Sequence, residues 1–521
     1  MKPKIVWMGA LTLCLFAAET EQDRWWAHVA YLADDRLEGR DTGSQGHREA
    51  ARYVAQEFER AGLKPAGTDG YVQPVRFRSF RIDEPGCELE LVFDGRTEKL
   101  TLGEDAYFNV RMDLAGEVET AMVFAGYGFA VPDNGFDEFE GLDVKGKLVL
   151  YLTGGPKNIP GPVMSHSQSA AERWKRAKEA GAIGLASISN PVASDIPWER
   201  AKLSRFLPAM RLRELPSDSD GSRIGLTLNP ASMDKLLAGS GHTMAEIQKV
   251  AAAGLRLPRF QLKARLRAKT RLSSADVESQ NVVGRLEGSH PSLKNEHIVL
   301  SAHLDHIGVG RPINGDALYN GAMDNASGIA SLIEIAGQLK GRRLKRSVLF
   351  VAVTGEEKGL LGSRYFAGAP TVASESMVAN LNLDMFLPLF PLTRVVAYGM
   401  DESTLGEAIR RVAKGEDVEV MRDPEPQRNS FIRSDQYSFI KAGVPALAFK
   451  LGYAPGSAEE GIFKAWLKDR YHAPSDDLLQ PVDRAAAVKF NRLMAAMAEQ
   501  VANGEKRPEW KAKSFFRRFA R

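Results

Sequence analysis

Short apolar runs alternate with amphipathic segments through the carboxy-terminal half of the chain. The runs are rich in β-branched residues and have the length of strands, whereas the segments between them repeat apolar positions at helical spacing. Strands that are apolar throughout and are separated by helices are typical of an α/β sheet covered on both faces. The predicted strands are 297–302, 347–353, 378–383, 395–398 and 445–449, and the predicted helices begin at Asp324 and span 402–414, 435–442 and 482–501.

The amino-terminal half contains two helices and a separate module. Residues 22–64 carry two apolar helical faces around a glycine-rich loop at 37–46, which either folds over a site or simply joins the helices. Strand-like alternation follows over 72–113. Residues 119–265 have their own pattern of strands and a helix without a metal-binding or nucleophilic cluster, so they form either a recognition lid or a spacer.

The predicted fold class is therefore α/β. We expect a three-layer α/β/α catalytic domain with a mixed, mostly parallel central sheet, and a smaller inserted domain. The domain ranges are a signal peptide at 1–18, a main domain in two parts at 22–118 and 278–503, the insertion at 119–265, and a basic tail at 504–521.

The first residues indicate an extracytoplasmic protein, periplasmic or secreted. A basic start is followed by a 14-residue apolar run that ends at Ala18, which matches a secretory signal and is too short for a membrane span. An uncleaved anchor is the alternative. If the signal is removed, Cys87 is the only cysteine left, and no intrachain disulfide can form.

Charge is nearly balanced over the chain and concentrated at its end. The net charge of +3 gives no reason to expect a nucleic-acid partner, and the oligomeric state is not readable. Residues 503–521 contain seven Lys or Arg and two Glu, with Trp510, Phe515, Phe516 and Phe519 among them. Such a segment suits contact with an anionic membrane surface, but a solvated, poorly ordered tail or a short helix docked on the core is the favoured alternative.

The main candidate chemistry begins where the strand at 297–302 ends. His303 and Asp305 are two residues apart, so on a strand both face the same way. We therefore expect His303 to bind a metal while Asp305 accepts its second ring N–H. Alone, this pair also fits a strand that ends in two solvated polar residues.

Matching groups follow other predicted strands. Asp324 opens a helix, Glu356 and Glu357 follow the strand at 347–353, Asp384 follows the strand at 378–383, and His472 lies in a loop before the last helix. In an α/β sheet such groups collect beyond the carboxyl ends of the strands. Imidazole and carboxylate ligands without thiolate suit Zn²⁺ or Mn²⁺ in an open hydrolytic site, and this number of ligands suggests two ions that share a carboxylate.

These motifs resemble those of the co-catalytic di-zinc aminopeptidases, a family that includes glutamate carboxypeptidases, glutaminyl cyclases and the non-catalytic transferrin receptor. The resemblance covers residues 22–503, including the loop at Leu37, and 119–265 resemble the protease-associated domain that many members carry. It implies a peptidase with two Zn²⁺ per chain and peptide substrates.

The resemblance also implies a role for each residue. His303 and Asp384 would hold one zinc, Glu357 and His472 the other, and Asp324 would bridge them with a cis peptide to Asn325. Glu356 would be the general base toward a metal-bridging hydroxide, and Asp305 would orient His303.

One segment departs from the family pattern. Gln436 stands where the family often has a histidine after Ser-Asp, so the donor that stabilises the oxyanion is open, with Tyr437 and Tyr471 as candidates. Three functions follow: an aminopeptidase as the main expectation, a carboxypeptidase or glutaminyl cyclase on the same site, with Arg428 or Arg433 to bind a terminal carboxylate, or a non-catalytic receptor-like binding protein.

Overall fold

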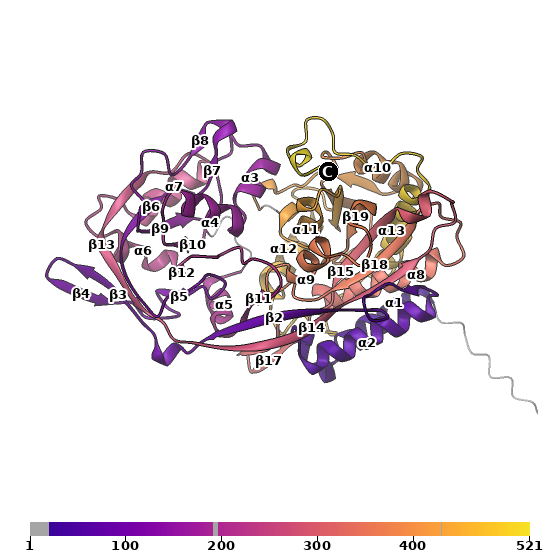
Figure 1. Ribbon diagram of the computed structural model, residues 1–521, viewed down its shortest axis with the longest axis horizontal. Helices are drawn as coiled ribbons and strands as arrows, with labels where there is room; N and C mark the ends of the chain where they lie inside the picture. Colours follow the sequence, from indigo (N-terminus) through magenta and orange to yellow (C-terminus); the bar gives the residue numbers. More distant parts are fainter. Residues whose placement is uncertain (1–19, 191–195, 429, 521) are drawn as a thin grey trace, which may run out of the picture.

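The computed structural model describes residues 20–190, 196–428 and 430–520, so the predicted signal peptide lies outside the described residues. A ten-stranded mixed sheet forms the main domain (Figure 1). Its strands, in spatial order, are β11 (Ala209–Leu212), β2 (Val72–Ile82), β14 (Leu272–Leu286), β18 (Ser347–Val353), β15 (His297–His303), β19 (Met377–Asn382), β22 (Ala446–Leu451), β20 (Arg394–Tyr398) and β21 (Glu419–Met421), with β1 (Lys64–Pro65) beside β14.

The centre of this sheet is parallel and its flanks are mixed. β15 runs parallel to β18 and β19, and β19 runs parallel to β22. β11, β2 and β14 extend the sheet beyond β18 by antiparallel pairing, and β20 is antiparallel to β22. The predicted mixed α/β sheet is confirmed, and the strands that carry the candidate site lie in its parallel centre.

Both faces of the sheet are covered, as a strand without polar alternation requires. Along β18, Val348, Phe350 and Ala352 pack on one face, whereas Leu349, Val351 and Val353 pack on the other. The first face is covered by α1 (Glu21–Leu32), α2 (Gln45–Arg60), α8 (Ser327–Leu339), α10 (Leu405–Gly415) and α13 (Arg484–Asn503), and the second by α9 (Leu361–Gly368) and α11 (Gln436–Lys441).

A second, eight-stranded sheet forms the inserted module, which lies at the left of Figure 1 and is joined to the main sheet by the long strands β2 and β14. Its strands are β4 (Arg96–Lys99), β3 (Glu88–Phe93), β13 (Arg259–Lys269), β6 (Glu117–Ala125), β9 (Leu148–Leu152), β10 (Gly184–Ile188), β12 (Ile224–Leu228) and β5 (Ala106–Phe108), and its helices are α3 (Gly161–Ser167), α4 (Ala170–Glu179), α5 (Trp198–Ala201), α6 (Met233–Leu237) and α7 (Met244–Ala252).

The module differs from the predicted range 119–265 at both ends and in the middle. β3, β4 and β5 precede residue 119 and belong to the second sheet, β13 continues past 265, and β11 leaves the module to pair with β2. Period-two alternation shows that a segment is a strand but does not show which sheet it joins, because either sheet buries the same face. The boundaries therefore lie where β2 ends and β14 begins.

Glu138 is a buried carboxylate in this module and makes stability depend on pH. It is fully buried, neither oxygen accepts a hydrogen bond from the described residues, and Arg256 and Arg259 approach Oε2 only to 3.9 and 3.8 Å. Burial raises the pKa of Glu138 from 4.5 to about 7, against the two arginines. The native state therefore keeps a proton that the unfolded chain releases at lower pH.

We expect Glu138 to make its full contribution to the free energy of unfolding below about pH 4.5. This contribution should be lost as the pH rises through 7, a change of roughly 3 kcal/mol. Glu138→Gln should remove this loss, so its Tm should fall less than that of the unmodified protein between pH 5 and pH 8. Glu140→Gln, which changes an exposed neighbour, is the matched control. Equal pH dependence of Tm in the unmodified protein and Glu138→Gln would assign Glu138 no role.

The basic tail docks on the main domain, which is one of its predicted alternatives. Trp510 donates its indole N–H to the carbonyl of Gly443 at 3.0 Å, and Phe516 is fully buried in a cluster with Phe431 and Ile440. These aromatic side chains are thus engaged in packing. In the described part of the chain, no helix has both the length and the apolarity to cross a bilayer.

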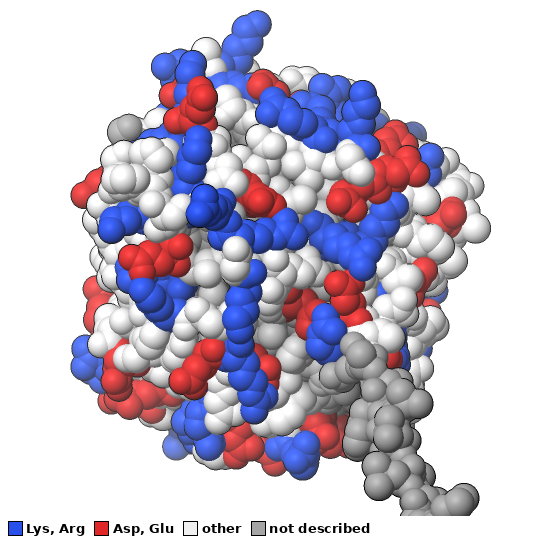
Figure 2. Space-filling model, turned by 90° about the vertical axis from the view of Figure 1, so that its right-hand side faces the viewer, with Lys and Arg blue, Asp and Glu red and all other residues white. Residues whose placement is uncertain are grey.

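Figure 2 shows the face at the right-hand end of Figure 1, where acidic and basic side chains are interspersed. This mixture agrees with the nearly neutral net charge of +3.

Candidate metal centre

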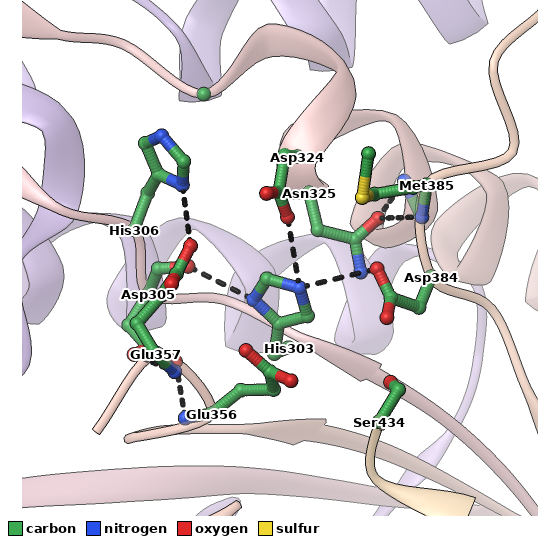
Figure 3. Close-up of polar contacts among 12 residues, drawn as sticks. His303, Asp305, His306, Asp324, Asn325, Glu356, Glu357, Asp384, Met385 and Ser434 are labelled. Atoms are coloured by element: carbon green, nitrogen blue, oxygen red, sulfur yellow. Dashed lines mark hydrogen bonds and ion pairs between the residues drawn. The ribbon is translucent and has the colours of Figure 1, made fainter. Parts of the chain in front are cut away.

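The candidate side chains meet at the carboxyl ends of the parallel strands, as predicted. His303 is the last residue of β15, Glu356 and Glu357 follow β18, and Asp384 follows β19. Asp324 lies in a short π-helical turn that leads into α8, and its peptide bond to Asn325 is cis, as expected. His472 follows α12 (Ala458–Asp469). Figure 3 shows His303 at the centre of this group, between Asp324 and Asp384.

The donor atoms are spaced as the ligands of metal ions are. His303 Nε2 lies 3.2 Å from Asp324 Oδ1 and 3.4 Å from Asp384 Oδ1. His472 Nε2 lies 3.2 Å from Asp324 Oδ2 and 3.3 Å from Glu357 Oε2. Two atoms bound at about 2.0–2.1 Å to one tetrahedral ion lie about 3.3 Å apart. One oxygen of Asp324 therefore lies with His303 and Asp384, and the other lies with His472 and Glu357.

Burial and charge fit the same interpretation. Asp384 Oδ1 and Glu357 Oε1 are buried, and neither accepts a well-aligned hydrogen bond from a described residue. Buried carboxylates without donors are costly unless a cation neutralises them. The residues present therefore fit one or two divalent ions.

The pKa shifts report the crowding of carboxylates and imidazoles. Burial alone would lower the pKa of His303, but Glu356, Asp324 and Asp384 raise it well above the ordinary value. Glu357 and Asp324 likewise raise the pKa of His472 to about 10 against burial. Burial and the charge of Glu357 raise the pKa of Glu356 well above normal, although His303 opposes them. Glu356 thus binds a proton far more readily than an exposed glutamate.

Glu356 and Glu357 reach one site because the strand has ended before them. β18 stops at Val353, and Gly355 adopts a φ of +67°, a left-handed conformation that glycine adopts readily. The chain therefore turns directly after β18. Glu357 faces His472 and His306, whereas the Glu356 carboxylate lies below the His303 ring in Figure 3.

Asp305 differs from its predicted contact. The Nδ1 atom of His303 contacts the backbone carbonyl of Asp305 at 3.0 Å, not the carboxylate. The carboxylate instead accepts hydrogen bonds from the backbone N–H groups of Glu356 and Glu357, at 3.1 and 3.3 Å, and from the Thr42 hydroxyl at 3.0 Å. Asp305 leaves the strand direction right after β15, so its carboxylate turns toward β18 and positions the two glutamates as well as His303.

We expect Asp305→Ala to lower kcat or metal affinity by about 10–100-fold, because the turn that holds Glu356 and Glu357 loses both of its carboxylate contacts. Thr42→Val removes one of the three hydrogen bonds to Asp305 and should have a smaller effect. Steady-state kinetics and chelator competition would measure both. An Asp305→Ala protein with unchanged kcat and unchanged metal affinity would exclude this role.

Four further residues support the site and were not predicted; Lys450 is half-buried and the other three are buried. His306 Nδ1 lies 2.9 Å from Glu357 Oε1, and Asp476 accepts the backbone N–H groups of Met323 and Asp324 at 2.9 and 3.0 Å. Arg40, fully buried, donates to the carbonyls of Leu32, Leu304, Asn320 and Gly321, and Lys450 donates to the Asp384 carbonyl at 2.7 Å. His306 and Asp476 are close in sequence to His303 and His472, which was the available signal, whereas nothing local marks Arg40 or Lys450.

The structure distinguishes between the two tyrosines proposed to stabilise the oxyanion. Tyr437 is hydrogen-bonded to His166 Nδ1 at 2.7 Å and does not line the metal cavity, whereas Tyr471 does. Gln436 lines the cavity, but its amide N–H donates to the Phe431 carbonyl at 2.9 Å. Tyr471 therefore remains as the tyrosine candidate.

The candidate ligands open into a cavity of about 330 Å³. Its walls include Met385, Tyr398, Arg428, Arg433 and Phe463. Its size is in the range of small-ligand pockets, so it can take one residue of a substrate beside the ligands.

Comparisons with known proteins agree with this geometry. A family described as Peptidase family M28 matches residues 281–498. A protein described as probable leucine aminopeptidase 2 from Aspergillus fumigatus is 26% identical over 346 residues, which are 61% of this chain and 65% of that protein. A probable zinc metalloprotease from Pyricularia oryzae is 37% identical over 112 residues, 22% of each protein. The chain thus spans less than two thirds of the length of these relatives.

Solved structures share the fold over almost the whole chain. An aminopeptidase from Aneurinibacillus sp. strain AM-1 aligns with a TM-score of 0.58 and 19% identity, over 94% of this chain and 95% of that one. BSAP, a zinc aminopeptidase from Bacillus subtilis, aligns with a TM-score of 0.50 and 18% identity, over 93% and 96%. Residues 281–498 thus match peptidase family M28, and the fold that surrounds them is shared with these solved structures.

Proposed function

We propose that the protein is a zinc-dependent exopeptidase, most simply an aminopeptidase that removes amino-terminal residues from peptides. The observation that carries the proposal is the convergence of His303, Asp384, Glu357 and His472 on the two oxygens of Asp324. The relatives named as a leucine aminopeptidase and as zinc metalloproteases support the choice of metal and of reaction.

The site would hold two Zn²⁺ ions. His303 and Asp384 would bind one ion, Glu357 and His472 the other, and Asp324 would bind both. His306, which lies against Glu357, belongs to the second group. This assignment uses Asp384 Oδ1 and Glu357 Oε1, the two oxygens of this group that accept no well-aligned hydrogen bond from a described residue.

Zinc in such a site supplies a Lewis acid that polarises a carbonyl and lowers the pKa of water. Glu356 is placed to accept a proton beside His303 and to return it to the leaving amine, since burial raises its pKa. Tyr471 lines the same cavity and is our candidate donor to the developing oxyanion. Asp305 and Asp476 hold the ligand-bearing turns through backbone N–H groups.

A carboxypeptidase is the second candidate, because Arg428 and Arg433 line the metal cavity. Assaying aminoacyl 4-nitroanilides, amino-terminally blocked peptides and amino-terminal glutamine peptides side by side tests the choice. We expect turnover of the first group only. Turnover of blocked peptides alone would favour the carboxypeptidase, cyclisation of glutamine would favour a cyclase, and no turnover would favour a binding protein.

Two further assignments complete the proposal. The apolar start of the chain would direct the protein outside the cytoplasm. The module between β2 and β14 would be a protease-associated domain that contributes to substrate selection, since α4 lies beside the cavity region of the main domain.

A further inference from the structure

A second cavity, of about 470 Å³, lies between α4 of the inserted module and α11 of the main domain. Gly359, Leu360, Arg428 and Arg433 line both this cavity and the metal cavity, so the two adjoin. The second cavity therefore lies next to the candidate metal site, on the side of the inserted module.

The second cavity is strongly cationic. Its only acidic lining residue among those described is Asp218, which pairs with Arg364 at 2.8 Å, and Arg428 pairs with Glu425 at 3.2 Å. Among the described residues, Arg433 and Lys441 have no carboxylate partner within 4.0 Å. The cationic lining residues are Arg173, Arg364, Arg428, Arg433 and Lys441.

Arg173 is the buried member of this group. It is 6% exposed and forms no ion pair with a described residue. Its Nε and Nη1 donate to the carbonyls of Tyr127 and Gln168, at 3.3 and 2.6 Å, whereas Nη2 makes no hydrogen bond within the described chain. Its guanidinium carbon lies 4.4 Å from the ring centre of Tyr151. A buried cation with a free N–H requires a counter-charge to offset its desolvation.

The first turn of α4 also favours an anion in this cavity. Ser169 caps this ten-residue helix, and Ser169, Ala170 and Ala171 line the cavity. The first backbone N–H groups of a helix have no partner within the helix, and its dipole favours an anion at this end. Arg173 and the start of α4 both line this cavity, so both favour an anionic group in it.

We propose that this second cavity binds the carboxy-terminal carboxylate of a short peptide whose amino-terminal residue lies at the metal ligands. This inference rests on the proposed aminopeptidase function and names its substrate class: short peptides with a free carboxyl end. A peptide carboxylate fits because the cavity adjoins the site where the peptide is cut. The module then selects substrates by supplying Arg173 and the α4 N-terminus.

The test compares kcat/KM for the free acid and the carboxy-terminal amide of Leu-(Gly)n peptides of two to six residues, scored by release of leucine. We expect the acid to be favoured by tenfold or more at one or two lengths. Arg173→Met, which keeps the packing on Tyr151, and Lys441→Met should each reduce that preference severalfold by slowing the acid alone. Lys175→Met, an exposed cation on α4, should leave it unchanged.

Leucine 4-nitroanilide has no carboxylate and reports on the metal site alone. If it is hydrolysed while acid and amide are cut equally at every length, the second cavity has no such role. The same holds if both Arg173→Met and Lys441→Met retain the full acid preference. If neither leucine 4-nitroanilide nor any peptide releases leucine, the proposed function itself fails.

Discussion

Replacing Glu356 with glutamine is expected to lower kcat by about 10²–10⁴-fold while the protein keeps its zinc. Glutamine has the shape of glutamate but cannot accept the proton. The short distances among the candidate ligands His303, Asp324, Glu357, Asp384 and His472 do not involve any atom of Glu356. The measurement is kcat on an aminoacyl 4-nitroanilide together with elemental analysis of the same sample.

The control for Glu356→Gln is Glu402→Gln. Glu402 is a half-buried glutamate that accepts the Ser514 hydroxyl near the docked tail, and burial raises its pKa as well. It should retain normal kcat. A Glu356→Gln protein with normal kcat would remove Glu356 from the reaction, and one that has lost zinc would make Glu356 a ligand instead of a base.

Asp324→Ala is expected to lose both metals and, with them, activity by a factor on the order of 10³ or more. One carboxylate contacts both histidine ligands, at 3.2 Å in each case, so its removal opens both ligand groups. The pKa of Asp324 is held well below normal by hydrogen bonds from His303 and His472, against burial, so it stays ionised. Zinc content after gel filtration and the Tm increase on adding zinc would measure the loss.

Asp477→Ala is the matched control for Asp324→Ala, because Asp477 is a partly exposed aspartate in the loop after His472 that caps the Leu479 N–H. It should bind zinc normally. Two zinc ions retained by Asp324→Ala would show that Asp324 does not bridge them.

The elements that carry the chemistry were predictable because they obey strong local rules. β15 and β18 are buried along their whole length, so their sequences are mostly apolar and lack the polar alternation of a half-exposed strand. A parallel centre places the residues that follow these strands at one edge. His303, Glu356, Glu357 and Asp384 could therefore be grouped before any contact was known.

Other features depend on contacts that no local pattern records. Which oxygen of Asp305 meets His303 depends on how the chain turns after β15, and the carboxylate and the carbonyl are equally plausible from the sequence. An arginine is usually expected at the surface. Arg40 is nevertheless fully buried, because four carbonyls of the loops behind the site accept its N–H groups. The predicted start of the module, residue 119, was too late in the chain, because β3 and β5 alternate like strands of the main sheet.

The most direct test of the central claim is turnover of leucine 4-nitroanilide by metal-free protein as Zn²⁺ is added in known equivalents. The two ligand groups that share Asp324 predict that kcat rises to its maximum as two equivalents are bound. A maximum that is complete at one equivalent would contradict the two-metal site, and absence of turnover at any zinc concentration would contradict the aminopeptidase.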